Sequence, residues 1–211
     1  MKITCVLYPQ MTALDLVGPY QVLALLPDVQ VRLAAVKQGP QQTDTGMSIV
    51  AEHALAELTD SELIVVPGTG RPNVPLSDPE LIGWLREHGP RARWVASVCT
   101  GSLLLAAAGL LRGKRATSHW LALSGLREFG AEPCSERVVF DGQVVTAAGV
   151  SAGIDMALSL VDRIYGAELA QTIQLGIEYD PAPPHRSGSP RTAPQSIIAA
   201  ATQAMTRHMN A

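Results

Sequence analysis

The chain has 211 residues, of which 47% are hydrophobic and 17% charged, and its formal net charge is -3 at pH 7. This size and composition are typical of one compact α/β domain with a sizeable core. The 16 basic residues form no cluster for a phosphate backbone and no apolar run is long enough to span a bilayer, so we expect no nucleic acid or membrane partner and a cytoplasmic location.

Short β-branched runs alternate with helical patterns along the chain, which favours an α/β single domain with a mostly parallel, flavodoxin-like sheet sandwiched by helices. Strands are predicted over residues 3–8, 29–37, 62–67, 93–98, 136–140 and 143–148. The last two form a hairpin across Asp141 and Gly142, a favoured two-residue turn. Helices are predicted over residues 16–26, 79–88, 102–111, 121–129, 152–165, 167–179 and 195–209.

The segment PAPPHRSGSPRTAP, residues 181–194, is too rich in proline for regular structure. It predicts an extended arm before the last helix. We therefore expect residues 1–194 to form one domain and residues 195–211 a C-terminal helix that packs on it.

Cys99 sits where the predicted buried strand RWVASV meets the predicted helix that follows Gly101. Such a nucleophile elbow lifts a side chain above the carboxyl edge of a parallel sheet, where α/β folds place their chemistry. The helix N-terminus favours the thiolate, so we expect a lowered pKa and an activated nucleophile. The alternative is a small buried apolar side chain, the usual situation of a free cysteine.

The other two cysteines predict no chemistry. Cys5 lies within the first predicted strand, where an inert buried thiol is expected, and Cys134 lies in a polar connection without an activating partner. Three widely spaced cysteines indicate neither a disulfide framework nor a zinc site, so we expect no metal.

Three side chains are candidates for moving protons near Cys99. Asp15 follows the first strand, and its carboxylate either reaches the cysteine across the sheet edge or caps the next helix. His119 follows the strand-like segment KRATSH and is either a base or a hydrogen-bonded packing residue. The hydroxyl of Thr100 is adjacent in sequence and able to orient a water or the substrate.

The loop VPGTGRPN after the strand ELIVVP contains Gly68, Thr69 and Gly70. It carries neither G-x-G-x-x-G nor a P-loop lysine, so we expect it to aim backbone N–H groups at developing negative charge, with phosphate binding the weaker option. Val150 precedes the helix predicted at 152–165, and it either lines the pocket near Cys99 or packs in the core.

These segments together resemble a known family. The residues that carry the resemblance are LDLVGP, VVPGTG, SVCTGSLLLAAAGLLRGKRATSHW, GVSAGIDMALSLV and IEYDPAPPHRSGSP, between about residues 2 and 194. They resemble the PfpI-type cysteine superfamily, whose fold is similar to class I glutamine amidotransferases. Within that superfamily the chain most resembles bacterial isocyanide hydratases.

The resemblance implies an enzyme, a homodimer without a cofactor, that adds water to an isocyanide and releases an N-substituted formamide. It implies Cys99 as the nucleophile and Asp15 as the acidic residue that faces it. Thr100 stands where relatives with protease-like activity often carry histidine, which argues against a Cys-His peptidase. The family's oxyanion-type loop commonly reads Pro-Gly-Gly, whereas this chain has Thr69, so the backbone is expected to differ if that glycine needs a positive φ.

The implied chemistry begins when the Cys99 thiolate attacks the terminal isocyanide carbon while Asp15, its pKa raised by a partly apolar pocket, supplies a proton. Water then attacks the thioimidate with the help of Asp15 or of a water held by Thr100. The substrate side of the site is assigned to Gly68, Thr69, Gly70, His119 and Val150.

Two alternatives use the same scaffold. A different covalent enzyme, such as a glyoxalase-like or amide-cleaving protein, would use Cys99 but fail on isocyanides. A ligand- or redox-sensing domain without turnover would resemble transcriptional regulators that share CTGSLLLAAAGLL and RATSHW. Those regulators continue into a helix-turn-helix domain, and one helix after residue 194 is too short for one, which favours an enzyme.

Overall fold

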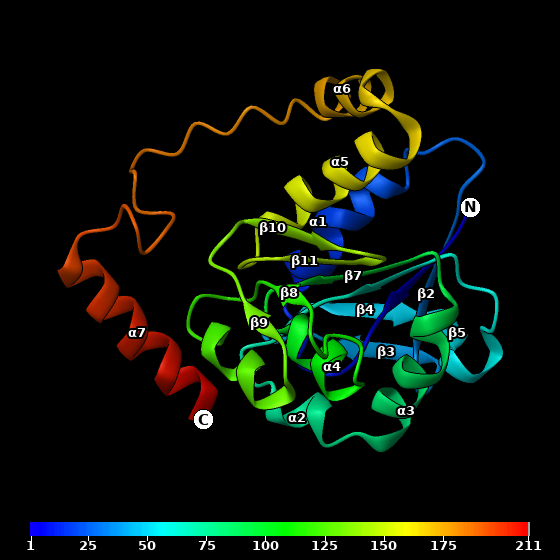
Figure 1. Cartoon of the computed structure of the whole chain (residues 1–211), viewed down its shortest axis with the longest axis horizontal. Coiled ribbons are helices and arrows are strands. Elements are labelled where there is room, and N and C mark those ends of the chain that lie inside the picture. Colours follow the sequence, from blue (N-terminus) through cyan, green and yellow to red (C-terminus); the bar gives the residue numbers. More distant parts are fainter. Residues whose placement is uncertain (211) are drawn as a thin grey trace.

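A seven-stranded sheet forms the centre of the molecule in a computed structural model that describes residues 1–210, with side chains up to residue 207. The strand order is β10-β11-β7-β6-β1-β2-β5, and every neighbouring pair is parallel except β10 and β11 (Figure 1). The strands of this sheet are β1 (Lys2–Val6), β2 (Gln30–Ala35), β5 (His53–Ala54), β6 (Leu63–Val66), β7 (Trp94–Val98), β10 (Val138–Asp141) and β11 (Val144–Ala147).

Helices cover both faces of this sheet. In Figure 1, α1 and α5 lie together over one face, α3 and α4 cover the other, and α6 packs on α5. The helices are α1 (Ala13–Leu23), α2 (Asn73–Leu76), α3 (Pro79–His88), α4 (Gly101–Ala107), α5 (Ala152–Tyr165), α6 (Ala167–Gly176) and α7 (Gln195–Asn210).

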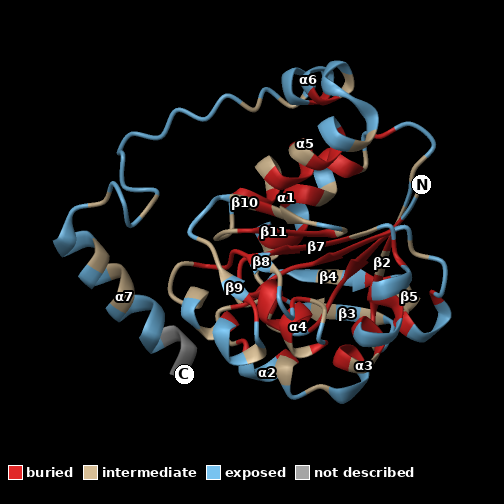
Figure 2. Ribbon diagram, viewed as in Figure 1, coloured by how far each residue is buried: buried red, intermediate tan, exposed pale blue. Residues whose placement is uncertain are grey.

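The sheet is buried because its parallel strands are apolar on both faces. All four residues of β6, LIVV, are buried, and so are the last four of β1 and of β7. Strands enclosed on both sides by helices require such continuous apolar runs. Figure 2 accordingly shows the central strands of this sheet in the buried colour and the outer helix faces exposed.

Several elements match the sequence prediction at their ends. The helix predicted over 79–88 is α3, whose first turn is capped by Asp78 through the N–H groups of Glu80 and Leu81. The helix predicted over 152–165 is α5. The predicted hairpin is β10–β11, but Asp141 belongs to β10 and pairs with Val144, so the two-residue turn is Gly142 and Gln143 and not the predicted Asp141 and Gly142.

Other elements differ from the prediction for local reasons. The first helix starts at Ala13 and not at residue 16, so Asp15 lies within its first turn. The helix predicted over 102–111 ends at Ala107, because Gly109 adopts a φ of 84° that stops it. The segment predicted as a helix over 121–129 is a 3-10 helix, Leu123–Phe129, and the helix predicted over 167–179 ends at Gly176.

Two small sheets were not predicted. The antiparallel pair β3 (Gly39–Gln42) and β4 (Ser48–Ala51) forms a hairpin, and β8 (Arg115–Ala116) pairs with β9 (Glu132–Pro133). The strand β3 reads GPQQ and has no apolar residue except proline, so no alternation of apolar and polar side chains marks it.

An extended arm leads from α6 to α7, along the left of Figure 1. Ile197, Ile198 and Ala201 on one side of α7 border a small cavity together with Trp120 and arm residues of the segment 187–193. Ala211, the last residue of the segment predicted to pack on the domain, lies outside the described residues. Among residues 1–210, no helix combines the length and the apolarity that a bilayer crossing requires.

The strand order reverses between β1 and β6, since the chain passes from β1 to β2 on one side and from β6 to β7 on the other. Ligands of open α/β sheets bind outside the carboxyl ends of the strands at such a switch point. The segments that leave β1, β6 and β7 there carry Asp15, Gly68 and Cys99 respectively.

The close approach of β6 and α4 depends on Gly101. A Cβ at this position would lie 2.3 Å from the carbonyl oxygen of Val66 and 2.7 Å from that of Pro67. We expect Gly101→Ala to lower the free energy of unfolding by about 3 kcal/mol or more, because backbone atoms on both sides must move. Urea unfolding followed by circular dichroism measures this.

Gly83→Ala is the matched control, since Gly83 also lies in a helix but a Cβ there meets nothing within 4 Å. This variant is expected to be up to about 1 kcal/mol more stable than the wild type. Equal effects of the two substitutions would show that the contact between α4 and β6 does not require glycine.

Candidate active site

Cys99 lies on a strained turn between β7 and α4. Its φ is 58°, in the left-handed region that side chains other than glycine rarely adopt. The N–H donates to the carbonyl oxygens of Ala147 and Ala148 at 3.0 and 2.9 Å, and the Cys99 carbonyl accepts from the hydroxyls of Ser102 and Ser118, each at 3.1 Å. A conformation that costs about 1–2 kcal/mol is therefore held by hydrogen bonds to both the N–H and the carbonyl of Cys99.

Asp15 is fully buried beside this thiol. Its Oδ2 accepts a 2.9 Å hydrogen bond from the N–H of Gly68, and its Oδ1 has no nitrogen or oxygen partner in the described part of the chain. The N-cap of α1 is Thr12, so the helix-capping alternative for Asp15 is wrong. The carboxyl group instead faces Cys99, closely enough for a hydrogen bond between the two side chains to affect the pKa of each.

Burial dominates the protonation of this pair. It raises the pKa of Asp15 to about 7, against the lowering effect of the hydrogen bonds from Gly68 and Cys99. It also raises the pKa of the Cys99 thiol, and the negative charge of Asp15 raises it further, although the N–H groups of Thr100 and Val150 act in the opposite direction. The prediction that a helix N-terminus lowers the pKa of Cys99 is therefore wrong, because desolvation outweighs the few amides of the short helix α4.

The two groups consequently titrate as a unit. At neutral pH the pair keeps at least one proton, since two adjacent buried charges of the same sign are unfavourable. That proton resides either on sulfur, beside a carboxylate, or on Asp15, beside a thiolate. A substrate whose carbon forms a bond to sulfur and also takes up a proton could therefore receive both from this pair.

Thr100 locks the cysteine turn onto the loop after β6. Its hydroxyl donates to the carbonyl of Thr69 at 2.7 Å and accepts from the N–H of the same residue at 2.7 Å. The proton of the hydroxyl is therefore already used in a hydrogen bond to the protein backbone and is not donated to a ligand. This geometry favours a positioning role for Thr100 over the predicted role of holding a water or the substrate.

The loop at residues 68–70 accommodates threonine without strain. Thr69 is absent from the residues with positive φ, and its hydroxyl donates to the carbonyl of Gln10 and accepts from the N–H of Arg71. The backbone of this chain therefore does not need a positive φ at position 69, and threonine fits there. The N–H groups of Gly68 and Thr69 are engaged with Asp15 and Thr100, which leaves Gly70 to face a ligand in this loop.

A cavity of about 340 Å³ opens above Cys99. Its wall is largely apolar and includes residues of α7, which the sequence prediction did not place near the site. The described residues that line it are Thr12, Asp44, Thr69, Gly70, Pro72, Cys99, Thr100, His119, Leu121, Ala122, Val150, Ala204 and Met205. Cys5 and Cys134 lie elsewhere; burial in β1 raises the pKa of Cys5 to about 12, as expected for an inert thiol.

Val150 borders this cavity with a backbone φ of 26°, and its N–H hydrogen bonds to the sulfur of Cys99. The side chain is partly buried against the core. Both predicted possibilities, cavity wall and core packing, therefore apply. The contribution through the amide was not predicted, because sequence does not reveal the direction of an N–H group in an irregular turn.

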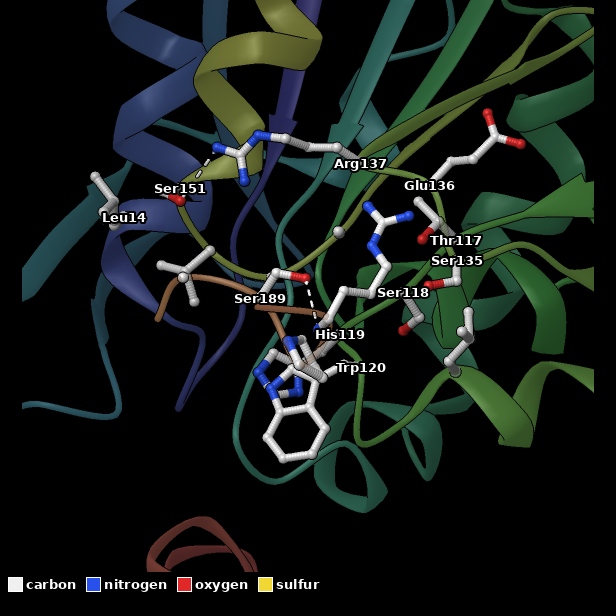
Figure 3. A pocket seen from close by; sticks show the side chains of 17 residues that line it. Leu14, Thr117, Ser118, His119, Trp120, Ser135, Glu136, Arg137, Ser151 and Ser189 are labelled. Carbon is white, nitrogen blue, oxygen red and sulfur yellow. Dashed lines mark hydrogen bonds between the residues drawn. The ribbon is translucent and has the colours of Figure 1, made fainter. Parts of the chain in front are cut away.

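His119 separates the cavity above Cys99 from a second, more polar cavity of about 350 Å³. Its Nδ1 accepts a hydrogen bond from the N–H of Leu121 at 3.3 Å, and burial lowers its pKa, so the ring is neutral and its Nε2 carries the proton. Figure 3 shows this second cavity, with the guanidinium of Arg137 bonded to Ser151 at its upper rim. The packing alternative for His119 fits better than a general base.

Asp44 and Thr12 are the polar residues of the cavity that sequence reasoning missed. Asp44 lies between β3 and β4, and its Oδ2 accepts a 2.6 Å hydrogen bond from the hydroxyl of Thr12. Asp44 was not predicted because the β3–β4 hairpin that carries it was not predicted. In the polar segment QQTDTGMS, an aspartate is typical of an ordinary turn. Within the described residues, no cluster of three or more His, Cys, Asp or Glu side chains is suited to a metal ion.

The chain is similar to known proteins over nearly its whole length. It is 44% identical to an isonitrile hydratase of Pseudomonas putida over 198 residues, which cover 94% of this chain and 87% of that protein. It is 35% identical over 134 residues to the HTH-type transcriptional regulator CdhR of Pseudomonas aeruginosa, a match that covers 63% of this chain and 40% of the regulator.

Solved structures share the fold. A ThiJ/PfpI family protein from Pseudomonas syringae superposes with a TM-score of 0.95 at 37% identity, covering 99% of this chain and 87% of that one. DJ-1 of Schizosaccharomyces pombe, with a TM-score of 0.73 at 16% identity over 84% of this chain and 98% of that one, has the same fold. Residues 1–163 match the DJ-1/PfpI family, and the chain belongs to that family.

Proposed function

We propose that this protein is an isocyanide hydratase that adds water to R–N≡C and releases R–NH–CHO. The observation that carries the proposal is the buried pair of Cys99 and Asp15 beneath a largely apolar cavity, in a chain so similar to an isonitrile hydratase. The pair supplies the nucleophile and the proton that addition to an isocyanide carbon needs, without a cofactor.

The first half of the reaction uses the shared proton. As the sulfur of Cys99 forms a bond to the terminal carbon, the proton of the pair moves to that same carbon and gives the thioimidate R–N=CH–S. Asp15 is then a carboxylate, and the sulfur no longer carries charge. The raised pKa of Asp15, about 7, keeps the proton available to the pair at neutral pH.

The second half regenerates the thiol. Water adds to the thioimidate carbon, nitrogen takes up a proton, and the resulting R–NH–CH(OH)–S intermediate loses its hydroxyl proton to Asp15 and sulfur as the C–S bond breaks. The N–H groups of Thr100 and Val150, which hydrogen bond to the sulfur, support it as a leaving thiolate. Thr100 acts by holding the turn, through its two hydrogen bonds to Thr69.

The cavity favours an isocyanide with a compact apolar R group. Leu121, Ala122 and Met205 supply apolar surface opposite the polar groups near Cys99. Burial of an apolar R group there would contribute roughly 25 cal/mol for each Å² removed from water. His119, Val150 and Gly70 complete the wall.

Formamide production from an aryl isocyanide, followed by absorbance and mass spectrometry, tests the function. We expect the wild-type protein to release one N-aryl formamide for each isocyanide consumed, over many turnovers. Absence of turnover by folded wild-type protein would reject the proposal. It would favour either another covalent enzyme on this scaffold or a sensing domain, since the chain also resembles a transcriptional regulator over part of its length.

We further propose that the enzyme is a cytoplasmic homodimer, as the family resemblance implies. Exposed apolar side chains on α1, Leu14 and Val17, and on the β3–β4 hairpin, Met47 and Val50, support association with a second copy. Sedimentation velocity distinguishes a dimer from a monomer of 22.4 kDa.

A further inference from the structure

A second carboxylate, that of Asp44, borders the cavity that holds Cys99. Two bonds fix this residue: its N–H donates to the carbonyl of Met11 at 3.0 Å, and its Oδ2 accepts from the hydroxyl of Thr12 at 2.6 Å. Thr12 is the N-cap residue of α1, yet its side chain makes no capping bond. The hydroxyl that would ordinarily cap the helix orients Asp44 instead.

The other carboxylate oxygen, Oδ1, is buried and has no hydrogen-bond partner in the described part of the chain. A carboxylate oxygen in this state loses the hydration it has in the unfolded chain and gains nothing in return, which is costly for stability. Buried polar atoms without a protein partner most often bind water or a ligand. Asp44 as a whole is half-buried and borders the cavity above Cys99, so water in this cavity has access to the residue.

The other titratable groups of the cavity wall are unable to accept a proton from water. The described wall contains three titratable groups, Asp44 itself, Cys99 and His119. Cys99 is bonded to the substrate after the first step, and neutral His119 accepts from Leu121 through Nδ1 while Nε2 carries its proton. Asp15 is fully buried, is not part of the described wall and faces the sulfur of Cys99, so its proton transfers are those that accompany the making and breaking of the carbon–sulfur bond.

We propose that Asp44, oriented by Thr12, is a second catalytic carboxylate that acts on the water attacking the thioimidate; this inference rests on the proposed function. As the water oxygen forms its bond to the thioimidate carbon, Asp44 takes one proton from the water. The electron pair of the C=N bond moves to nitrogen, and Asp44 returns the proton to that nitrogen. The product of this step is the neutral R–NH–CH(OH)–S intermediate, and Asp44 is again a carboxylate.

The two carboxylates thus divide the proton transfers. Asp15 serves sulfur and the carbon–sulfur bond, whereas Asp44 serves water and nitrogen. Their environments suit these roles: burial, with a smaller contribution from the charge of Asp44, raises the pKa of Asp15 and keeps a proton there. Asp44 borders the cavity, where it is placed to act on water instead of on the sulfur.

The test compares Asp44→Asn with the wild type on phenyl isocyanide, by steady-state turnover and by intact mass after rapid quenching. Asparagine retains an acceptor for Thr12 but is not a base. We expect turnover to fall by roughly a hundredfold or more. The adduct at Cys99, heavier than the free protein by one isocyanide, should form within a few-fold of the wild-type rate and accumulate.

Asp28→Asn is the matched control, because Asp28 is an exposed turn residue whose backbone carbonyl, and not its side chain, accepts a hydrogen bond from the N-terminal amino group, and it should behave as the wild type. Asp44→Gly keeps the proposal open to test if the asparagine variant folds poorly, since added formate should restore its turnover. Wild-type turnover by Asp44→Asn, or parallel loss of adduct formation and turnover, would overturn the role of Asp44 while leaving the hydratase assignment intact. Failure of the wild type to make formamide would instead reject the function itself, and the role of Asp44 with it.

Discussion

Replacement of Cys99 by serine is expected to lower formamide production by at least about a thousandfold, with no covalent adduct detectable by intact mass. The hydroxyl has nearly the shape of the thiol, so the turn and the hydrogen bonds of the residue's backbone N–H and carbonyl should persist. An alkoxide is far harder to form than a thiolate in a site where burial already raises the pKa of the thiol. Steady-state turnover of an aryl isocyanide and the mass of the quenched protein are the measurements.

Cys134→Ser is the matched control for this substitution. Cys134 is a free, half-buried thiol whose sulfur contacts the carbonyl of Glu132 at 3.6 Å, an interaction that a hydroxyl also makes. The control should retain wild-type turnover and form the adduct at Cys99. Turnover by Cys99→Ser above about a tenth of the wild-type rate would contradict a covalent mechanism, since a loss that small is below what removal of a nucleophile causes.

The fold was predictable because the central strands of its sheet are short, continuous runs of apolar residues. The strand LIVV of β6 is buried on both faces, and the hairpin of β10 and β11 is present with Gly142 in its turn at a φ of 61°, although the turn lies one residue later than predicted. The β3–β4 hairpin was missed for the opposite reason. Its first strand, GPQQ, packs at the margin of the molecule, where no apolar periodicity is needed.

The same contrast explains what could be predicted of the site. Cys99 and Asp15 follow apolar strands that the sequence marks clearly, and parallel strands bring their carboxyl ends to one edge. Asp44 and Met205 reach the cavity from a polar hairpin and from a helix at the far end of a proline-rich arm. Positions set by such long connections depend on tertiary contacts that no local pattern encodes.

The pKa of Cys99 is shifted in the direction opposite to the prediction because the local helix terminus is not the main influence on this thiol. The neighbours that matter are distant in sequence: Asp15 comes from the segment after β1, and the amide of Val150 comes from the segment after β11. Their combined effect depends on how deeply the pair is buried. Burial is a property of the folded chain, and it decides the sign here.

Asp15→Asn is expected to reduce turnover by roughly a hundredfold to ten-thousandfold, because the proton shared with Cys99 is lost. The amide oxygen of asparagine still accepts from the N–H of Gly68, so the loop after β6 should keep its position. Adduct formation should slow together with turnover, in contrast to the effect expected at Asp44. Rapid quenching and intact mass distinguish the two variants.

The same substitution should make the protein less sensitive to high pH. In the wild type, the pKa of Asp15 is about 7 when folded and near 3.8 when unfolded, so the folded state binds more protons between these values and stability falls as pH rises from 4 to 7. The loss is on the order of 4 kcal/mol and is complete above pH 7. Asparagine has no charge to bury, so urea unfolding at pH 5 and pH 8 should show a smaller loss for Asp15→Asn. Asp162→Asn, at an exposed position of α5, should follow the wild type, and an unchanged pH dependence in Asp15→Asn would mean that Asp15 is not the buried group that titrates.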